Sequence, residues 1–147
     1  MKDEWIMDFD LIIPEPRYKS DCPKKYQVNK SSHIAEDENR PWFNWYDWRC
    51  AYWGTKWNAY DGYTIIGKTQ LTFVFSTAWC IPTQIYSLLG ELCVKSKYSM
   101  EIRYADEDIG HNCGIITYNA KEHDVVVQTE EDITNPERFA NYIWSKY

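Results

Sequence analysis

The sequence predicts an α+β fold in which an antiparallel sheet has helices packed on one face and a Trp-rich helix lies N-terminal to the sheet. The first observation is the order of patterns from residue 70 onward, which reads strand, helix, strand, strand, strand, helix. The second is that Trp, Tyr and Phe make up 17% of the 147 residues. Disordered chains are depleted in aromatic residues, so these residues indicate a packed core. The length suits one domain, and we treat 1–147 as a single domain.

The first forty residues predict one short strand and then an irregular segment. Phe9, Leu11 and Ile13 alternate with other residues, which is the spacing of a strand. Prolines at positions 14 and 16 end this pattern. Residues 17–40 are polar and rich in turn-forming residues, and we expect an irregular excursion from the domain there.

A Trp-rich helix is predicted to begin at Pro41, with Asn39 or Arg40 as its N-cap, and to end at Gly54. Eight of the 16 residues from 42 to 57 are aromatic. So many rings cannot all be exposed without causing aggregation. We therefore interpret the segment as the central wedge of the core, and the alternative is an aromatic pocket or interface formed by the rings at its edge.

Regular patterns follow from residue 70. Residues 71–75 are β-branched and aromatic, which is typical of a buried strand. Apolar residues at helical spacing after Pro82 predict a helix. Further strands are predicted at 98–104, 113–118 and 124–128, and Asn135-Pro136 begins a closing helix. The strands at 71–75 and 98–104 are predicted to form a βαβ unit with the helix between them.

The charge distribution argues against nucleic acid as the main partner. Residues 1–99 hold 12 acidic and 12 basic residues, whereas residues 100–147 hold 10 acidic and 4 basic ones, which accounts for the net charge of −6. Only two basic residues, at positions 24 and 25, stand side by side. The acidic last third is either a solvated face that aids solubility or a docking surface for a basic partner protein.

Several classes of protein find no support in the sequence. No apolar stretch is long enough to span a membrane, and no secretory signal is visible, so we expect a cytoplasmic protein without a membrane partner. Five cysteines without a CxxC spacing indicate reduced thiols, and the scattered His and Cys residues predict neither a metal nor a cofactor. Motifs of nucleophile elbows, phosphate-binding loops and zinc proteases are missing, so we expect a protein that is not an enzyme.

Three strings carry a resemblance to a known family: Phe9 to Pro16, Asn44-Trp45 through Trp53-Gly-Thr-Lys-Trp-Asn-Ala59, and Phe75-Ser-Thr-Ala-Trp79 with Pro82. With them the chain resembles the YubB-like family, whose members carry a ferredoxin-like domain and are encoded on bacteriophages and plasmids. The resemblance implies a ferredoxin-like core at 70–147 and an origin in a mobile genetic element. That family has no settled biochemical function, so no catalytic residue is implied.

Seven residues are candidates for a binding surface. Lys56 is flanked by indole rings and is expected to make cation–π contacts with them. The acidic turn offers a contact for a basic partner. The full set is Trp53, Lys56, Trp57, Asn58, Asp106, Glu107 and Asp108.

Three functions fit these features. The first is a small non-enzymatic protein that binds a host protein or protein complex with a basic surface, as counter-defence inhibitors of the anti-CRISPR kind do. The second is single-stranded nucleic-acid binding, with bases stacked on aromatic residues of the sheet. The third is a small-ligand pocket with Lys56 and Asn58 as polar anchors.

Overall fold

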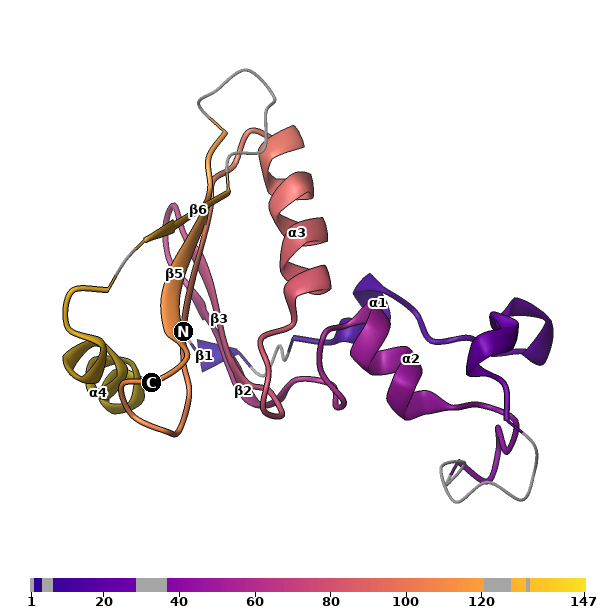
Figure 1. Cartoon of the computed structure of the whole chain (residues 1–147). Helices are drawn as coiled ribbons and strands as arrows, with labels where there is room; N and C mark the ends of the chain where they lie inside the picture. Colours follow the sequence, from indigo (N-terminus) through magenta and orange to yellow (C-terminus); the bar gives the residue numbers. More distant parts are fainter. Residues whose placement is uncertain (1, 4–6, 29–36, 121–127, 132) are drawn as a thin grey trace. The chain divides into compact units, whose positions relative to one another are not determined.

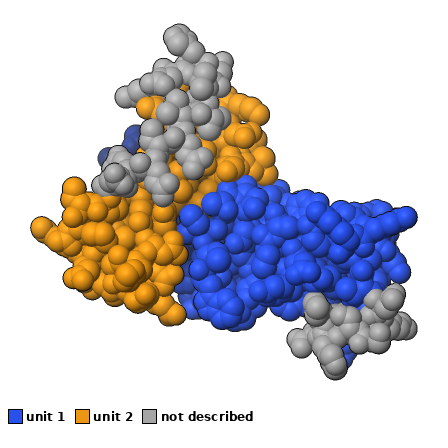
Figure 2. Space-filling model, in the orientation of Figure 1, with its two compact units in different colours: residues 1–85 blue, residues 86–147 orange. Residues whose placement is uncertain are grey.

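The chain forms two compact units, residues 1–85 and residues 86–147 (Figure 2). The computed structural model describes residues 2–3, 7–28, 37–120, 128–131 and 133–147. Each unit contains a three-stranded antiparallel sheet together with helices. The predicted α+β class is therefore confirmed, and each unit is described by itself.

In the first unit, helix α1 (Phe9–Ile12) stands where a strand was predicted at 9–13. The Asp8 side chain caps this helix by accepting a hydrogen bond from a main-chain N–H of the first turn at 3.0 Å. Phe9 is fully buried whereas Leu11 is 81% exposed, so alternate residues do not share a face. The strand prediction was wrong because a pattern of only five residues cannot distinguish a strand from one helical turn, and the local cap by Asp8 decides between the two.

The described part of the excursion at 17–40 contains two short 3-10 helices, η1 (Lys19–Asp21) and η2 (Lys24–Tyr26). An isolated β-bridge then joins Gln27 to Phe43. Residues 29–36 lie outside the described part of the chain.

Helix α2 (Trp45–Tyr52) is the predicted Trp-rich helix, and it begins later than predicted. Asn44 is its N-cap and accepts a hydrogen bond from the Asp47 N–H at 3.2 Å. The predicted N-cap at Asn39 or Arg40 was wrong. The chain before α2 forms turns instead, in which the Phe43 N–H donates to the Arg40 carbonyl at 2.9 Å, and the Asn44 N–H then donates to a carbonyl of η2 at 2.8 Å.

The interpretation of the Trp-rich segment as a core wedge is confirmed for Phe43, Trp48 and Trp53, whereas Tyr46 of α2 is exposed. Trp48 is 3% exposed and Trp53 is 1% exposed, and their rings meet edge to face at 5.7 Å. Phe43 contacts Trp48 in the same way at 5.9 Å, and Phe9 contacts Trp53 at 5.9 Å. These rings join α1, the bridge segment and α2 into one aromatic core.

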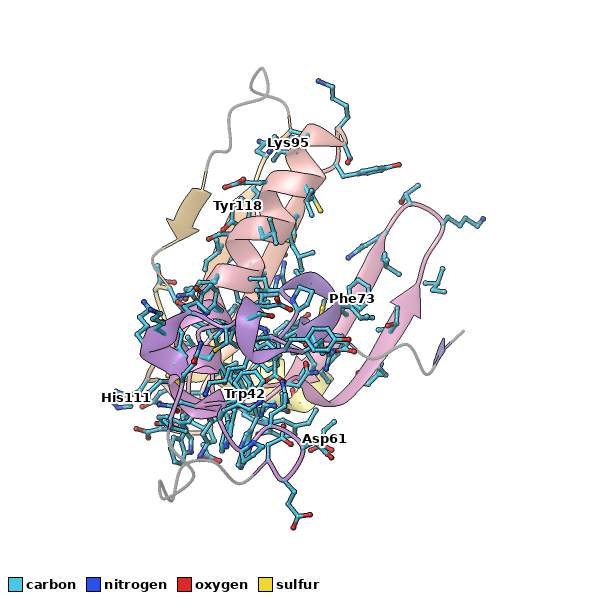
Figure 3. All side chains as sticks on the ribbon, turned by 90° about the vertical axis from the view of Figure 1, so that its right-hand side faces the viewer. Trp42, Asp61, Phe73, Lys95, His111 and Tyr118 are labelled. Carbon is cyan, nitrogen blue, oxygen red and sulfur yellow. The ribbon has the colours of Figure 1, made fainter. Side chains whose placement is uncertain are left out.

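The sheet of the first unit has the order β1-β2-β3, formed by Lys2–Asp3, Tyr60–Ile66 and Leu71–Ser76. Strand β2 was not predicted, because an irregularity in its pairing with β3 at Tyr60 to Tyr63 interrupts the alternation. Asp61, which has a φ of 49°, lies at this irregularity, at the base of the β2–β3 hairpin (Figure 3).

The second unit contains the sheet β4-β5-β6, formed by Met100–Ala105, Cys113–Tyr118 and Gln128–Glu131. The strands predicted at 98–104 and 113–118 match β4 and β5. Most of the strand predicted at 124–128 lies outside the described residues. The predicted βαβ unit was wrong, because β3 belongs to the sheet β1-β2-β3 whereas β4 belongs to the sheet β4-β5-β6.

Helix α3 (Thr83–Lys95) runs along the sheet of the second unit (Figure 1). Its Gly90 packs on the ring of Tyr118 so closely that a Cβ atom there would lie 2.3 Å from a ring carbon. The closing helix α4 (Pro136–Lys146) begins as predicted, with Asn135 as its N-cap. The ring N–H of Trp144 in α4 donates to the Asp106 carbonyl at 2.9 Å.

Candidate functional site

Two of the candidate residues, Trp53 and Asn58, are part of the interior scaffold. Trp53 is buried and donates its ring N–H to the Ile13 carbonyl at 2.9 Å. The side-chain oxygen Oδ1 of Asn58 accepts hydrogen bonds from the N–H groups of Phe9 at 2.8 Å and Ala59 at 2.9 Å. Its amide nitrogen donates to the Asp8 carboxylate at 2.7 Å. Both side chains therefore hold α1 in place rather than face a partner.

Gly54 and Thr55 fix the path of the chain between these two residues. Gly54 has a φ of 85°, and a Cβ atom on it would lie 2.9 Å from the Thr83 nitrogen. Thr55 is buried and donates its hydroxyl hydrogen to the Ala78 carbonyl at 3.0 Å. The hydrogen bond from Thr55 brings residues 77–80 next to the segment that carries Lys56.

Lys56 and three aromatic residues form the exposed part of this region, which we call the Lys56 cluster: Lys56, Trp57, Tyr60 and Trp79. The Lys56 Nζ lies 3.3 Å from the ring centroid of Trp79 and 4.4 Å from that of Trp57. The Trp57 ring meets Tyr60 edge to face at 6.2 Å. The expected cation–π contact with Trp57 is present, whereas Trp53 receives the guanidinium of Arg49 at 5.1 Å.

The rings of the Lys56 cluster are open to solvent. Trp79 is 72% exposed, Trp57 is 48% exposed and Tyr60 is 39% exposed. Trp57 thus lies outside the core wedge. For this residue the alternative interpretation applies, in which a ring at the edge of the wedge contributes to an aromatic pocket or interface. Large aromatic side chains are typical anchors of protein interfaces when they stand on a surface.

Trp79 is held outward by a strained turn. The Cys80 N–H donates to the Ala78 carbonyl at 2.8 Å, which closes a three-residue turn over Trp79. Trp79 has a φ of 64°, a left-handed conformation that is unfavourable for a bulky residue. The Thr77 hydroxyl donates to the Cys80 carbonyl at 2.8 Å and holds the turn from its other side. Strain of this kind persists only where the surrounding contacts impose it.

The chain matches one family model over residues 52–142, which is more than half of its length. That model describes the ferredoxin-like domain in Api92-like protein. The chain belongs to this family. The ferredoxin-like fold predicted from the sequence is therefore confirmed. No curated protein and no solved structure matches the chain.

The ferredoxin-like domain of the Api92-like family, as matched here, includes the whole Lys56 cluster. The match begins at Tyr52, before the predicted start of the core at 70, and so takes in Lys56, Trp57, Tyr60 and the Trp79 turn. The acidic turn at 106–108 also lies inside it.

Within this domain, the acidic turn separates into one structural and two exposed residues. The Asp106 carboxylate accepts hydrogen bonds from the Asp108 N–H at 3.0 Å and the Asn112 amide at 3.2 Å. These two donors lower the pKa of Asp106 below its ordinary value. Glu107 and Asp108 are exposed. Asp106 therefore holds the turn together, and Glu107 and Asp108 are the two carboxylates of the turn that can contact a partner.

The thiol beside the Lys56 cluster is not activated for chemistry. Burial and the nearby Asp47 carboxylate raise the pKa of Cys50, and these effects outweigh the Tyr46 hydrogen bond and Lys56, which lower it. A thiol with a raised pKa carries little thiolate at neutral pH and is a poor nucleophile.

The described ranges hold neither a cluster of metal-ligating side chains nor a membrane-spanning helix. Nowhere in them do three His, Cys, Asp or Glu side chains come together as ligands for a metal ion. No helix within them has the length and apolar character that crossing a bilayer requires.

Sequence reasoning found Lys56 and Trp57 but missed Tyr60 and Trp79. These residues lie up to 23 positions apart and are brought together by the hydrogen bond from Thr55 to Ala78 and by the β2–β3 pairing. The available signal was the further indole of Trp79, which entered only as part of the string that carries the family resemblance.

Proposed function

We propose that this protein is a non-enzymatic binding protein that contacts another protein through the Lys56 cluster. The observation that carries the proposal is Trp79, which is 72% exposed at a φ of 64°. The positive φ strains the backbone, and the exposed indole leaves a large apolar surface in water. Both are unfavourable for the free protein, and a bound partner would cover the apolar surface.

The surroundings of the cluster support a binding role rather than a catalytic one. The hydrogen bonds of Thr55 and Asn58 make a rigid base under it, and a preformed surface loses less conformational entropy on binding. The raised pKa of the neighbouring Cys50 thiol also gives no support to nucleophilic chemistry.

A second contact is proposed at the exposed carboxylates Glu107 and Asp108, toward a partner with a basic surface. The unit from residue 86 onward holds 11 acidic and 6 basic residues, so it carries −5 of the total charge of −6. Complementary charge accelerates association and favours basic partners.

The biological setting is proposed from the resemblance of the motif strings. We propose that the protein is YubB-like, encoded on a phage or plasmid, and acts in the cytoplasm of a bacterial host. A counter-defence role, as an anti-CRISPR-like inhibitor that binds a host complex, agrees with a binding surface that lacks catalytic groups.

The two alternative functions receive less support. A single-stranded nucleic acid needs several cations along its backbone, and the Lys56 cluster supplies one. A small-ligand pocket would use Asn58 as a polar anchor, but the side-chain oxygen and nitrogen of Asn58 both make hydrogen bonds within the protein.

The proposal is tested by affinity capture from a bacterial host lysate followed by mass spectrometry. The wild-type chain is compared with a Trp57→Ser, Trp79→Ser double variant. The control is a Tyr18→Ser, Tyr98→Ser double variant, which removes rings that are 71% and 70% exposed elsewhere.

We expect the wild type and the control to capture the same protein, and the tryptophan variant to lose it while its thermal unfolding stays cooperative. Equal capture by all three chains would place the binding surface elsewhere.

A further inference from the structure

Lys56 differs from the arginines of the same unit, since it pairs with none of the acidic residues that the structure describes. Arg17 pairs with Asp10, whereas Arg40 and Arg49 both pair with Glu15. Among the residues that the structure describes, no carboxylate lies within ion-pair distance of Lys56 Nζ, and no acceptor takes a hydrogen bond from it. Its neighbours are two ring faces.

This arrangement leaves the ammonium group of Lys56 to be hydrated by solvent, because the described part of the protein offers it ring faces rather than hydrogen-bond acceptors. Lys56 is of intermediate exposure, and the rings beside it exclude part of the water that would hydrate its charge. Ring faces attract a cation but accept no conventional hydrogen bond from it. An anion brought to Lys56 would form a charge-assisted hydrogen bond in a partly dry setting, where such bonds are strong.

We propose that the Lys56 cluster recognises an acidic side chain of the partner protein, Asp or Glu, that is flanked by an apolar or aromatic side chain. The carboxylate binds Lys56 Nζ, and the flanking side chain lies on the exposed ring of Trp79. This inference rests on the proposed function and specifies the chemistry of the partner.

Charge and geometry favour a carboxylate in a protein over the phosphates of a nucleic acid. The unit that carries the cluster holds 11 acidic and 10 basic residues and so has a charge of −1. The exposed Asp61 lies next to Tyr60 in the chain and would repel a run of phosphates. A single carboxylate among apolar neighbours matches one ammonium beside two ring faces.

The test is selection of binders from a displayed library of random twelve-residue peptides. Three full-length chains serve as targets: the wild type, Lys56→Met and Lys56→Glu. Methionine keeps an unbranched apolar side chain against the rings and removes the charge. Glutamate reverses the charge at the same place.

We expect peptides selected on the wild type to share an Asp or Glu beside an aromatic or large aliphatic residue. Such a peptide should bind Lys56→Met about tenfold more weakly, since a hydrogen bond to a charged group contributes enough for that ratio. Selection on Lys56→Glu should return Lys or Arg in place of the acid.

Wild-type peptides without an acidic residue, or with equal affinity for Lys56→Met, would overturn the inference while leaving a protein-binding role for the rings intact. Selection that returns no peptide from any target would overturn it as well. Binding of a fluorescent single-stranded oligonucleotide that is lost in Lys56→Met would instead assign the site to nucleic acid and would contradict the proposed function too.

Discussion

Glu15 is a buried carboxylate that pairs with two arginines of the N-terminal unit. It is 5% exposed, and its two oxygens accept from Arg40 at 2.8 Å and from Arg49 at 2.5 Å. Arg40 also pairs with Asp37 at 2.7 Å. One buried carboxylate thus joins the segment before α2 to α2 itself.

Replacing this carboxylate by an amide leaves two guanidinium groups without their shared anion. Glu15→Gln should lower the free energy of unfolding by about 1–3 kcal/mol, because both guanidinium groups are partly exposed and Arg40 keeps its pair with Asp37. The control Glu91→Gln removes the exposed pair with Lys95 at 3.9 Å and should change it by less than about 0.5 kcal/mol. Urea denaturation measures both, and equal effects would show that the network does not stabilise the fold.

The carboxylate of Asp106 should make the stability of the fold depend on pH in a defined direction. Its pKa is lowered by the Asp108 N–H and the Asn112 amide, so its contribution to stability is present above the pKa of the unfolded chain. That contribution is lost as the pH falls through the lower pKa of the folded state. The melting temperature of Asp106→Asn should therefore fall less than that of the wild type between pH 5 and pH 2.5.

Glu107→Gln is the matched control for this measurement, because it removes an exposed neighbouring carboxylate. Its melting profile should follow that of the wild type. Parallel profiles of Asp106→Asn and the wild type would mean that the carboxylate does not hold the turn.

At the scale of elements, Gly90 sets how closely α3 approaches its sheet. Substitution of glycine by alanine inside a helix stabilises it by about 1 kcal/mol through propensity alone. Here the added Cβ would lie 2.3 Å from the Tyr118 ring, so Gly90→Ala should instead lower the free energy of unfolding by about 1–3 kcal/mol.

A double-mutant cycle with Tyr118→Leu checks this explanation. The smaller side chain should relieve the contact, so the cost of Gly90→Ala should be smaller in the Tyr118→Leu background. A stabilising effect of Gly90→Ala in the wild-type background would contradict the packing of α3 on Tyr118.

Elements with strong periodicity or strong caps could be predicted from the sequence. Helix α3 follows from its apolar spacing, β5 from its composition, and the start of α4 from Asn135-Pro136. Helix α1 could not be predicted, because its cap depends on Asp8 and on an acceptor 49 residues away in Asn58. Strand β2 was missed because the irregularity around Asp61 hides its alternation.

The candidate site shows the same limit. Lys56 and Trp57 are adjacent in the chain, and their contact could be predicted. Trp79 joins them through the Thr55 hydrogen bond to Ala78 and a turn with positive φ, neither of which leaves a periodic signal. Asn58 was taken for a ligand anchor because nothing in the sequence shows that its amide is used inside the fold.

At the scale of the whole molecule, the two units differ in charge, since one carries −1 and the other −5. Reversal of the exposed acids in Glu107→Lys, Asp108→Lys should weaken capture of the partner and reduce the dependence of binding on salt. Asp106 is left unchanged because it holds the turn.

The control for this reversal is Glu38→Lys, Glu91→Lys, which changes the net charge equally at exposed positions elsewhere. Binding should be weaker in the first variant than in the second, measured by titration with the captured partner at several salt concentrations. Equal loss in both would mean that net charge matters and the acidic turn does not.

The central claim is that the Lys56 cluster is covered by a protein partner, and oxidative footprinting of the captured complex tests it most directly. Hydroxyl radicals modify exposed indoles, so Trp57 and Trp79 should be labelled in the free chain and protected in the complex, while Tyr18 is labelled equally in both. Unchanged labelling of Trp57 and Trp79 in an intact complex would contradict the claim.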